Sequence, residues 1–271
     1  MRAYLAEFLA DPRVVKLPRW LWLPILHGIV LRTRPAKSAE KYAQIWMPEG
    51  SPLAVYTARQ AKLLAQKTGQ RVAYAMRYGA PSVAEAMQRL GSPVVLPLYP
   101  QYAESTTASV ADVLPRGVRM IEHFHDHPAY IAALAANIAR HRQGGTLLMS
   151  FHGLPKKGAE RYERECRETA TLLARKLNTD RYLVTFQSRF GYAEWLGPAT
   201  DATLRKLGAQ GVERVEVVCP GFVADCLETL EEIGIAGRQT FLESGGREFR
   251  LLPCLNDSPE WISAMAEIVR A

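Results

Sequence analysis

Apolar runs in this chain alternate with stretches in which apolar residues recur every three or four positions. Segments such as "TLLMSFH" (146–152) are apolar almost throughout, which is typical of strands buried in a parallel sheet. The stretches between them have helical periodicity, and the last begins with Ser258 as N-cap and Pro259 in the first turn. The pattern predicts an α/β fold with parallel sheets covered by helices. The strand-like segments are 71–79, 93–101, 118–124, 146–152, 181–188, 214–221 and 248–256.

The predicted strands divide into two groups, which indicates two Rossmann-like lobes, each a parallel sheet flanked by helices. Residues 1–142 would form the N-terminal lobe and residues 143–271 the C-terminal lobe. The second half opens on a strand, whereas the first opens directly on a helix over 2–9, so we expect the N-terminal lobe to lack a first strand. In such folds ligands bind at the carboxyl ends of the strands.

The composition narrows the classes of protein without identifying one. A chain of 271 residues that is 48% hydrophobic and 23% charged is typical of a globular protein. The net charge of +7 favours an acidic small molecule or an anionic membrane surface, and the lack of a long Lys/Arg run disfavours nucleic acid. With no visible signal peptide and no CxxC pair, we expect a cytoplasmic protein with reduced thiols and no iron–sulfur cluster. Its cysteines are Cys166, Cys219, Cys226 and Cys254.

The segment "WLWLPILHGIVL" (20–31) contains no acidic residue, lysine or arginine, yet it is too short to cross a bilayer. Arginines flank it at positions 19, 32 and 34. Two interpretations stay open. The segment is either a buried helix or an exposed apolar lip that holds a flat hydrophobic ligand or touches a membrane.

Residues capable of acid–base or metal chemistry gather where the predicted strands end. His152 follows an apolar strand and precedes a Gly-Leu-Pro turn, where a neutral imidazole could ligate a metal, accept a proton or simply form a hydrogen bond. Arg77 and Tyr78 end the strand at 71–79. No GxSxG, P-loop or GxGxxG motif is present, which disfavours hydrolases, NTPases and dinucleotide-binding enzymes.

A glutamate in the stretch "ADCLETLEE" is the second candidate. Glu228 follows Asp225 by three positions, so both could share one face of a helix that begins just after a strand. Simple exposure of Glu228 is the alternative. We expect Glu231 and Glu232 to lie on the solvated side, because leucines and an isoleucine at 227, 230 and 233 indicate where the helix is buried.

The run "EHFHDH" (122–127) offers a competing metal site. His123, His125 and His127 alternate, so in an extended chain all three would face one side. The run is similar to the HxHxDH motif of binuclear metallohydrolases but is one residue short of it. We interpret it as a polar strand end and keep metal ligation as the alternative.

Five motifs standing in one order resemble the ferrochelatase family, which inserts ferrous iron into protoporphyrin at the end of haem synthesis. The resemblance runs over nearly the whole chain. The motifs are "GSPLAVYTARQ" (50–60), "LPLYPQYAESTT" (96–107), "SFHGLP" (150–155), "FQSRFGYAEWLGPAT" (186–200) and "CPGFVADCLETLEEI" (219–233).

The resemblance implies two Rossmann-like lobes with a cleft between them and a role for each of two residues. His152 matches the residue that contacts the metal and accepts the pyrrole protons. Glu228 matches the glutamate that faces this histidine across the porphyrin. In the family the helix that carries this glutamate contains a π-type widening, which would turn Asp225 and Glu228 into the cleft.

The same resemblance implies where the porphyrin binds. Residues 19–34 resemble the lip that grips the macrocycle. Arg77 and Tyr78 match an aromatic–basic pair at the cleft. The residues similar to groups that contact the porphyrin and its propionates are Arg34 (or Arg32), Tyr42 and Ser51, although two extra residues between the last two weaken the match at Ser51.

The resemblance also sets expectations about substrates and location. We expect a lyase that takes protoporphyrin IX and ferrous iron, with no tightly bound cofactor, in the cytoplasm and in peripheral contact with the inner face of the membrane. Family members usually begin with a strand that ends in an "NLGTP"-like turn, and this chain starts after it. The alternatives are a chelatase for another metal or tetrapyrrole, a non-catalytic porphyrin or haem carrier, and a metallohydrolase built on the histidines of 123–127.

Overall fold

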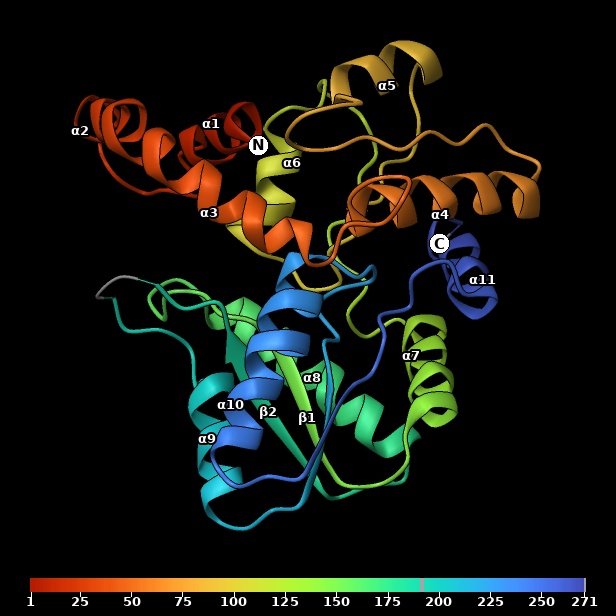
Figure 1. The fold of residues 1–271 in the computed structure, drawn as a ribbon. Helices are drawn as coiled ribbons and strands as arrows, with labels where there is room; N and C mark the ends of the chain where they lie inside the picture. The colour runs from red at the N-terminus through yellow and green to blue at the C-terminus, as the bar shows by residue number, and fades with distance from the viewer. Residues whose placement is uncertain (191–192, 271) are drawn as a thin grey trace.

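The computed structural model describes residues 1–190 and 193–270, so two residues of the 186–198 segment lie outside the described chain (Figure 1). Within these residues the second half forms one four-stranded parallel sheet in the order β2-β1-β3-β4. The four strands predicted there are confirmed as β1 (Thr146–His152), β2 (Tyr182–Gln187), β3 (Arg214–Val218) and β4 (Glu248–Leu251). The last two end earlier than predicted, because Pro220 and Pro253 soon follow and have no N–H for the ladder.

Successive residues of β1 point to opposite faces of the sheet, and each face has its own helices. Leu148 packs in a cluster with Leu204 of α9 (Thr200–Ala209) and Phe241 of α10 (Arg238–Glu243). Leu147, Met149 and Phe151 pack in another cluster, with α7 (Pro128–His141) and α8 (Glu160–Lys176). Figure 1 shows α9 and α10 on one side of the sheet and α8 on the other. The α/β class predicted from the sequence is therefore confirmed.

The first half of the chain is built from helices, and the prediction of a sheet there is wrong for the described residues. Segments 71–79, 93–101 and 118–124 are extended but form no strand. Only one step of parallel pairing joins two of them: Val95 N–H donates to the Arg119 carbonyl at 2.9 Å, and Ile121 N–H donates to the Val95 carbonyl at 2.9 Å. An apolar run becomes a strand only where a neighbour offers a ladder of partners, and these segments offer one another very little. The missing first strand stays a prediction.

The helices of the first half precede α7 in the following order. They are α1 (Arg2–Ala10), α2 (Arg19–Ile25), the π-helix η1 (Leu26–Val30), α3 (Leu31–Ala43), α4 (Pro52–Thr68), α5 (Val83–Leu90), the π-helix η2 (Glu104–Ala108) and α6 (Ser109–Ala111). In the part of the chain that the structure describes, no helix has both the length and the apolar character needed to cross a membrane.

The largest core cluster crosses the boundary that we predicted between residues 142 and 143. It joins Leu64 and Phe124 of the first half to Phe151 and Trp261 of the second. The last helix, α11 (Pro259–Ile268), packs against α4 and α7, as Figure 1 shows. Its predicted start is confirmed, because the Ser258 hydroxyl accepts the Trp261 N–H at 3.4 Å. The division into two lobes stays a prediction, and its halves share a core.

Replacing Trp261 with alanine is expected to lower the free energy of unfolding by about 3–5 kcal/mol. Trp261 is 0% exposed and packs against the rings of Phe124 and Tyr130. Its indole N–H has no hydrogen-bond partner within the described chain, so Trp261→Phe should cost far less. Urea unfolding of the three proteins measures the difference. An alanine variant as stable as its parent would contradict the view that this shared core holds the two halves together.

Candidate active site

His152 lies at the carboxyl end of β1, where the chain turns sharply beside β2. Its Nδ1 lies 2.6 Å from the carbonyl oxygen of Gly153. A carbonyl oxygen only accepts hydrogen bonds, so Nδ1 carries the proton and Nε2 keeps a free lone pair. A Cβ at position 153 would lie 2.5 Å from the Gln187 carbonyl oxygen, so only glycine allows this turn. The half-buried imidazole can therefore use Nε2 to accept a proton or contact a metal.

Glu228 begins the π-helix η3 (Glu228–Gly237), which confirms the widened helix expected from the resemblance. In the sheet His152 is the register partner of Gln187, and the Gln187 side-chain amide donates to the Glu228 carbonyl at 2.8 Å. The start of η3 is thus fixed next to the end of β1. Asp225, the other acidic residue of this motif, is buried. Its carboxylate is held by hydrogen bonds that it accepts from Thr229 (2.9 Å) and Asn256 (2.7 Å).

The expectation that Glu232 lies on the solvated side is wrong. Its carboxylate accepts hydrogen bonds from the Ser188 N–H (2.6 Å) and hydroxyl (2.5 Å). Burial raises the pKa of Glu232, with a smaller contribution from the charge of Glu228, while the Ser188 hydrogen bonds and His152 oppose the rise. Glu228 and Glu232 therefore lie close enough to interact, and His152 acts on the second of them.

Glu231 is also buried, contrary to the sequence prediction. Lys41 of α3 donates to its two carboxylate oxygens at 2.7 and 2.8 Å. More than four residues occupy each turn of a π-helix, so a wider arc of η3 faces the protein than an α-helical pattern indicates. The ion pair joins the first half of the chain to the helix that carries Glu228.

The charge of Glu228 acts on three tyrosines of the first half. They are Tyr4 in α1, Tyr42 in α3 and Tyr99. Burial first, and then the charge of Glu228, raises the pKa of Tyr42 to about 12. The same two causes raise the pKa of Tyr99, and partial burial, Tyr42 and Glu228 raise that of Tyr4. Of the three, only Tyr42 was a sequence candidate. Tyr99 stands in the 96–107 motif, whereas no local signal marks Tyr4.

Arg77 and Tyr78 form a network with Asp11, just after α1. Arg77 donates to the Asp11 carboxylate (2.7 Å) and to the Ser109 carbonyl (2.8 Å), and the Tyr78 hydroxyl donates to Asp11 (2.8 Å). Burial alone would raise the pKa of the Asp11 carboxyl. Hydrogen bonds from Ser109, Arg13 and Tyr78 outweigh this effect and hold the pKa of Asp11 below its usual value. The charge of Arg77 opposes the rise in the pKa of Tyr99, so the network acts on one of these three tyrosines. A cavity of about 420 Å³ adjoins the network.

The remaining candidates lie along α3 and at the start of α4. Arg34 and Arg32 are exposed on α3. Ser51 is the N-cap of α4, and its hydroxyl accepts the Ala54 N–H at 3.4 Å. Among the described residues, no hydrogen bond or ion pair joins Arg34 or Ser51 to His152 or Glu228, so their contact with a ligand stays a prediction.

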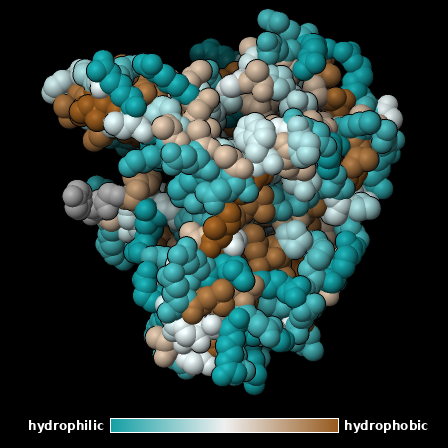
Figure 2. Space-filling model, viewed as in Figure 1, coloured by the Kyte–Doolittle hydropathy of each residue, from teal (hydrophilic) through white to brown (hydrophobic). Residues whose placement is uncertain are grey.

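The segment 20–31 forms α2 and η1 and is an exposed lip rather than a buried helix. Trp20 is 79% and Ile29 62% exposed, and Figure 2 shows an apolar patch over this end of the molecule. The opposite side of the lip packs on α1 through Leu26, and the Trp22 indole donates to the Leu9 carbonyl at 2.7 Å. The lip therefore has one side packed against α1 and an exposed apolar side.

Comparison with known proteins gives one consistent result. The family model for ferrochelatase matches residues 1–271. The ferrochelatase of Azoarcus sp. (strain BH72) is 52% identical over 298 residues, covering 100% of this chain and 82% of the relative. That of Chromobacterium violaceum is 50% identical over 299 residues, covering 100% and 82%.

Solved structures with little sequence identity share the fold. SirB from Bacillus subtilis with Fe³⁺ superposes with a TM-score of 0.57 at 14% identity, covering 82% of this chain and 91% of SirB. CbiX, the terminal enzyme of sirohaem biosynthesis in denitrifying bacteria, superposes with a TM-score of 0.51 at 17% identity, covering 86% and 92%. These two show the fold alone. The match over the full chain, at about half identical residues, places this protein in the ferrochelatase family.

Proposed function

We propose that this chain inserts ferrous iron into protoporphyrin IX to form protohaem, as a lyase of haem biosynthesis. The observation that carries the proposal is the geometry around Gln187 in a member of this family. His152 at the end of β1 is the sheet partner of Gln187, and Glu228 at the start of η3 accepts a hydrogen bond from the Gln187 side chain through its backbone carbonyl. Ferrous iron is a substrate here, and the proposal involves no tightly bound cofactor and no iron–sulfur cluster. The four cysteines are buried thiols.

His152 supplies the base that metal insertion requires. A free porphyrin holds two N–H protons inside its ring, and both must leave when the metal enters. Distortion of the ring by binding would tilt the nitrogen lone pairs toward the metal. Nε2 of His152 is free to accept a pyrrole proton, because its Nδ1 is engaged with Gly153. The same hydrogen bond would stabilise the imidazolium that forms.

Glu228 and Glu232 offer a way for protons to leave the site. Glu228 can stabilise the imidazolium or accept a proton, and Glu232 is one helical turn further along η3. The raised pKa of Glu232 brings its protonation nearer to neutral pH, which suits a group that takes up and releases protons. Carboxylate and imidazole ligands also hold ferrous iron without enclosing it in a tight cage.

Replacing Glu232 with glutamine is expected to reduce the loss of stability that occurs as the pH rises. Burial raises the pKa of Glu232, so the folded protein holds this proton more strongly than the unfolded chain does. That stabilisation is complete below the unfolded pKa and is lost as the pH rises through the folded pKa. Urea unfolding at about pH 5 and about pH 8 tests the prediction. Identical pH dependence in Glu232→Gln and in its parent would contradict it.

The porphyrin binds, in this proposal, between the lip and the tyrosines on which the charge of Glu228 acts. An apolar macrocycle matches the exposed face of α2 and η1, and the exposed guanidinium groups of Arg32 and Arg34 match its propionates. The apolar lip favours protoporphyrin over coproporphyrin, which carries more propionates. A panel of ferrous iron with protoporphyrin, coproporphyrin or sirohydrochlorin tests this choice. Faster insertion into either of the other two would replace the proposed substrate.

We extend the proposal to peripheral contact of the lip with the cytoplasmic face of the membrane, where an anionic surface would attract the +7 chain. Replacing Trp20 and Ile29 with serine is expected to weaken binding to anionic lipid vesicles at least about tenfold, because each buried apolar side chain contributes about 1.5–3 kcal/mol. Vesicle flotation measures the binding. Val113→Ser is the matched control, since Val113 is exposed but lies outside the lip. Equal binding by the lip variant would exclude this contact.

A further inference from the structure

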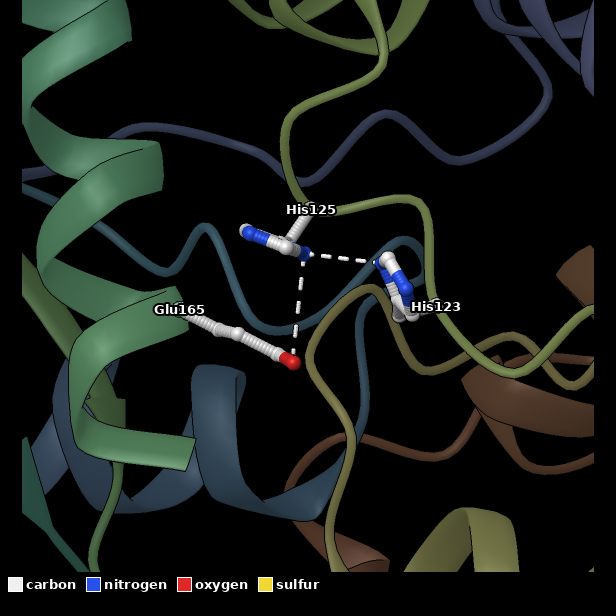
Figure 3. A group of neighbouring side chains, drawn as sticks. All are labelled: His123, His125 and Glu165. Carbon is white, nitrogen blue, oxygen red and sulfur yellow. Dashed lines mark hydrogen bonds and ion pairs between the residues drawn. The ribbon is translucent and has the colours of Figure 1, made fainter. Parts of the chain in front are cut away.

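A second group of metal-ligating side chains lies where segment 122–127 packs against α8. His123 and His125 of the segment and Glu165 of α8 point toward one another (Figure 3). The two Nδ1 atoms are 3.1 Å apart, and a Glu165 carboxylate oxygen lies 3.8 Å from Nδ1 of His125. His125 and Glu165 are each 5% exposed. None of the three has a role in the proposed iron insertion.

The hydrogen bonds of His125 fix which of its nitrogens faces the group. Its Nε2 lies 3.2 Å from a carboxylate oxygen of Glu168, and a carboxylate only accepts. Nε2 therefore carries the proton, and Nδ1 directs a lone pair toward His123 and Glu165. A carboxylate that holds the far nitrogen of a histidine is the usual support of a metal-ligating imidazole.

Glu165 is held in place in a similar way. Its Oε1 accepts from Arg161 at 2.7 Å and its Oε2 from the Tyr102 N–H at 2.6 Å, so Oε2 is kept on the side of the two imidazoles. Arg161 offsets part of the charge of Glu165, but two further carboxylates leave the surroundings negative overall. Glu168 and Asp126, whose Oδ1 is 3.7 Å from Nδ1 of His125, add negative charge beside the three ligands.

The spacing fits a small divalent ion. With metal–nitrogen distances of about 2.0–2.1 Å, tetrahedral ligand atoms lie about 3.3 Å apart. The observed 3.1 and 3.8 Å differ from this by amounts that side-chain rotation removes. His127 does not belong to the group, although it completes the alternating histidines in the sequence. Its Nδ1 accepts the Ala129 N–H at 3.2 Å and caps α7.

We propose that His123, His125 and Glu165 bind one divalent transition-metal ion, separate from the iron that is inserted. Two imidazoles and one carboxylate suit zinc, cobalt or ferrous ions rather than magnesium or calcium. The ion would join segment 122–127 to α8. Tyr162, which precedes Glu165 on α8, donates to the His152 carbonyl at 2.9 Å, so a bound ion would fix the helix that supports the catalytic turn.

The test is binding of zinc alone, measured by equilibrium dialysis, together with the visible absorption of bound cobalt. His152→Ala serves as the parent protein, because it removes the imidazole of the proposed insertion site. We expect it to bind one equivalent of zinc at the cluster and to give the intense absorption of four-coordinate cobalt. Adding His123→Asn should remove that equivalent, and Glu168→Gln should weaken it by about 10- to 100-fold.

His127→Asn is the matched control, because it changes a histidine of the same segment and keeps a residue that can cap α7. It should bind zinc as the parent does. Unchanged zinc affinity and cobalt absorption in the His123→Asn variant would overturn the proposal. Failure of the His152→Ala parent to bind any zinc would overturn it as well. Neither result depends on iron insertion, so the proposed function is tested separately.

Discussion

His152→Ala is expected to lower the rate of iron insertion into protoporphyrin by at least about a hundredfold, the low end of what a positioned general base contributes. The variant removes the one free imidazole lone pair at the end of β1 and leaves the lip and the tyrosines in place. Porphyrin affinity should therefore change little while turnover is lost. Steady-state kinetics and a porphyrin fluorescence titration separate the two effects.

His141→Ala is the matched control for this variant. His141 ends α7, where its Nδ1 contacts the Asn137 carbonyl at 2.8 Å, so its loss should leave the rate of insertion unchanged. A His152→Ala protein with the rate of its parent would exclude His152 as the base. A variant that loses porphyrin binding instead of turnover would assign His152 to the binding surface.

Glu228→Gln is expected to lower kcat by about 10- to 100-fold, with a smaller change in KM. Glutamine keeps the size of the side chain but removes the proton acceptor and the negative charge that acts on Tyr4, Tyr42 and Tyr99. Because that charge helps to raise the pKa of Tyr42 to about 12, the pKa of Tyr42 should fall in the variant. A pH titration of tyrosine absorbance gives a readout that is independent of activity.

Glu243→Gln is the control for Glu228→Gln, since Glu243 ends α10 and, among the residues that the structure describes, its side chain accepts from Gln239 of the same helix alone, at 2.8 Å. This control should match the parent protein in kcat and in its tyrosine titration. An unchanged kcat in Glu228→Gln would show that the carboxylate takes no part in insertion, even if the tyrosine titration shifts as expected.

The strands of the second half could be predicted from the sequence, and those of the first half could not. A run such as Leu147 to Phe151 becomes a strand because β2 and β3 pair with both of its edges. Val95 has an equally apolar context, yet it pairs only around Met120. The alignment with the Azoarcus relative spans 298 residues against 271 in this chain, so that relative carries residues within the matched region that this chain lacks. Hydropathy does not reveal whether a neighbouring strand is present.

For the candidate catalytic residues, too, the sequence is informative only where the signal is local. His152 could be predicted from a strand followed by a turn, and Glu228 from its motif. The sequence pattern places Glu232 on the solvated side, because an α-helix has one narrow buried side and η3 is a π-helix. The spacing of four residues between Glu228 and Glu232 is a signal that the two share a face. No sequence pattern indicates that Glu228 affects the pKa of Tyr4, because the two residues are far apart in the chain.

The histidine run shows how a spacing rule can group residues that the fold then separates. Alternation in an extended chain placed His127 with His123 and His125. The chain instead turns into α7 at His127, and the third side chain of the proposed metal site comes from α8. No pattern within 122–127 could have identified Glu165.

The most direct test of the central claim is metal insertion by the unmutated chain. Zinc can replace iron in the assay, and the change in porphyrin fluorescence follows each turnover. Catalytic turnover with protoporphyrin IX, at many product molecules per protein, is the result that the proposed function predicts. Tight binding of protoporphyrin with no zinc porphyrin formed would contradict it and would show the chain to be a porphyrin carrier.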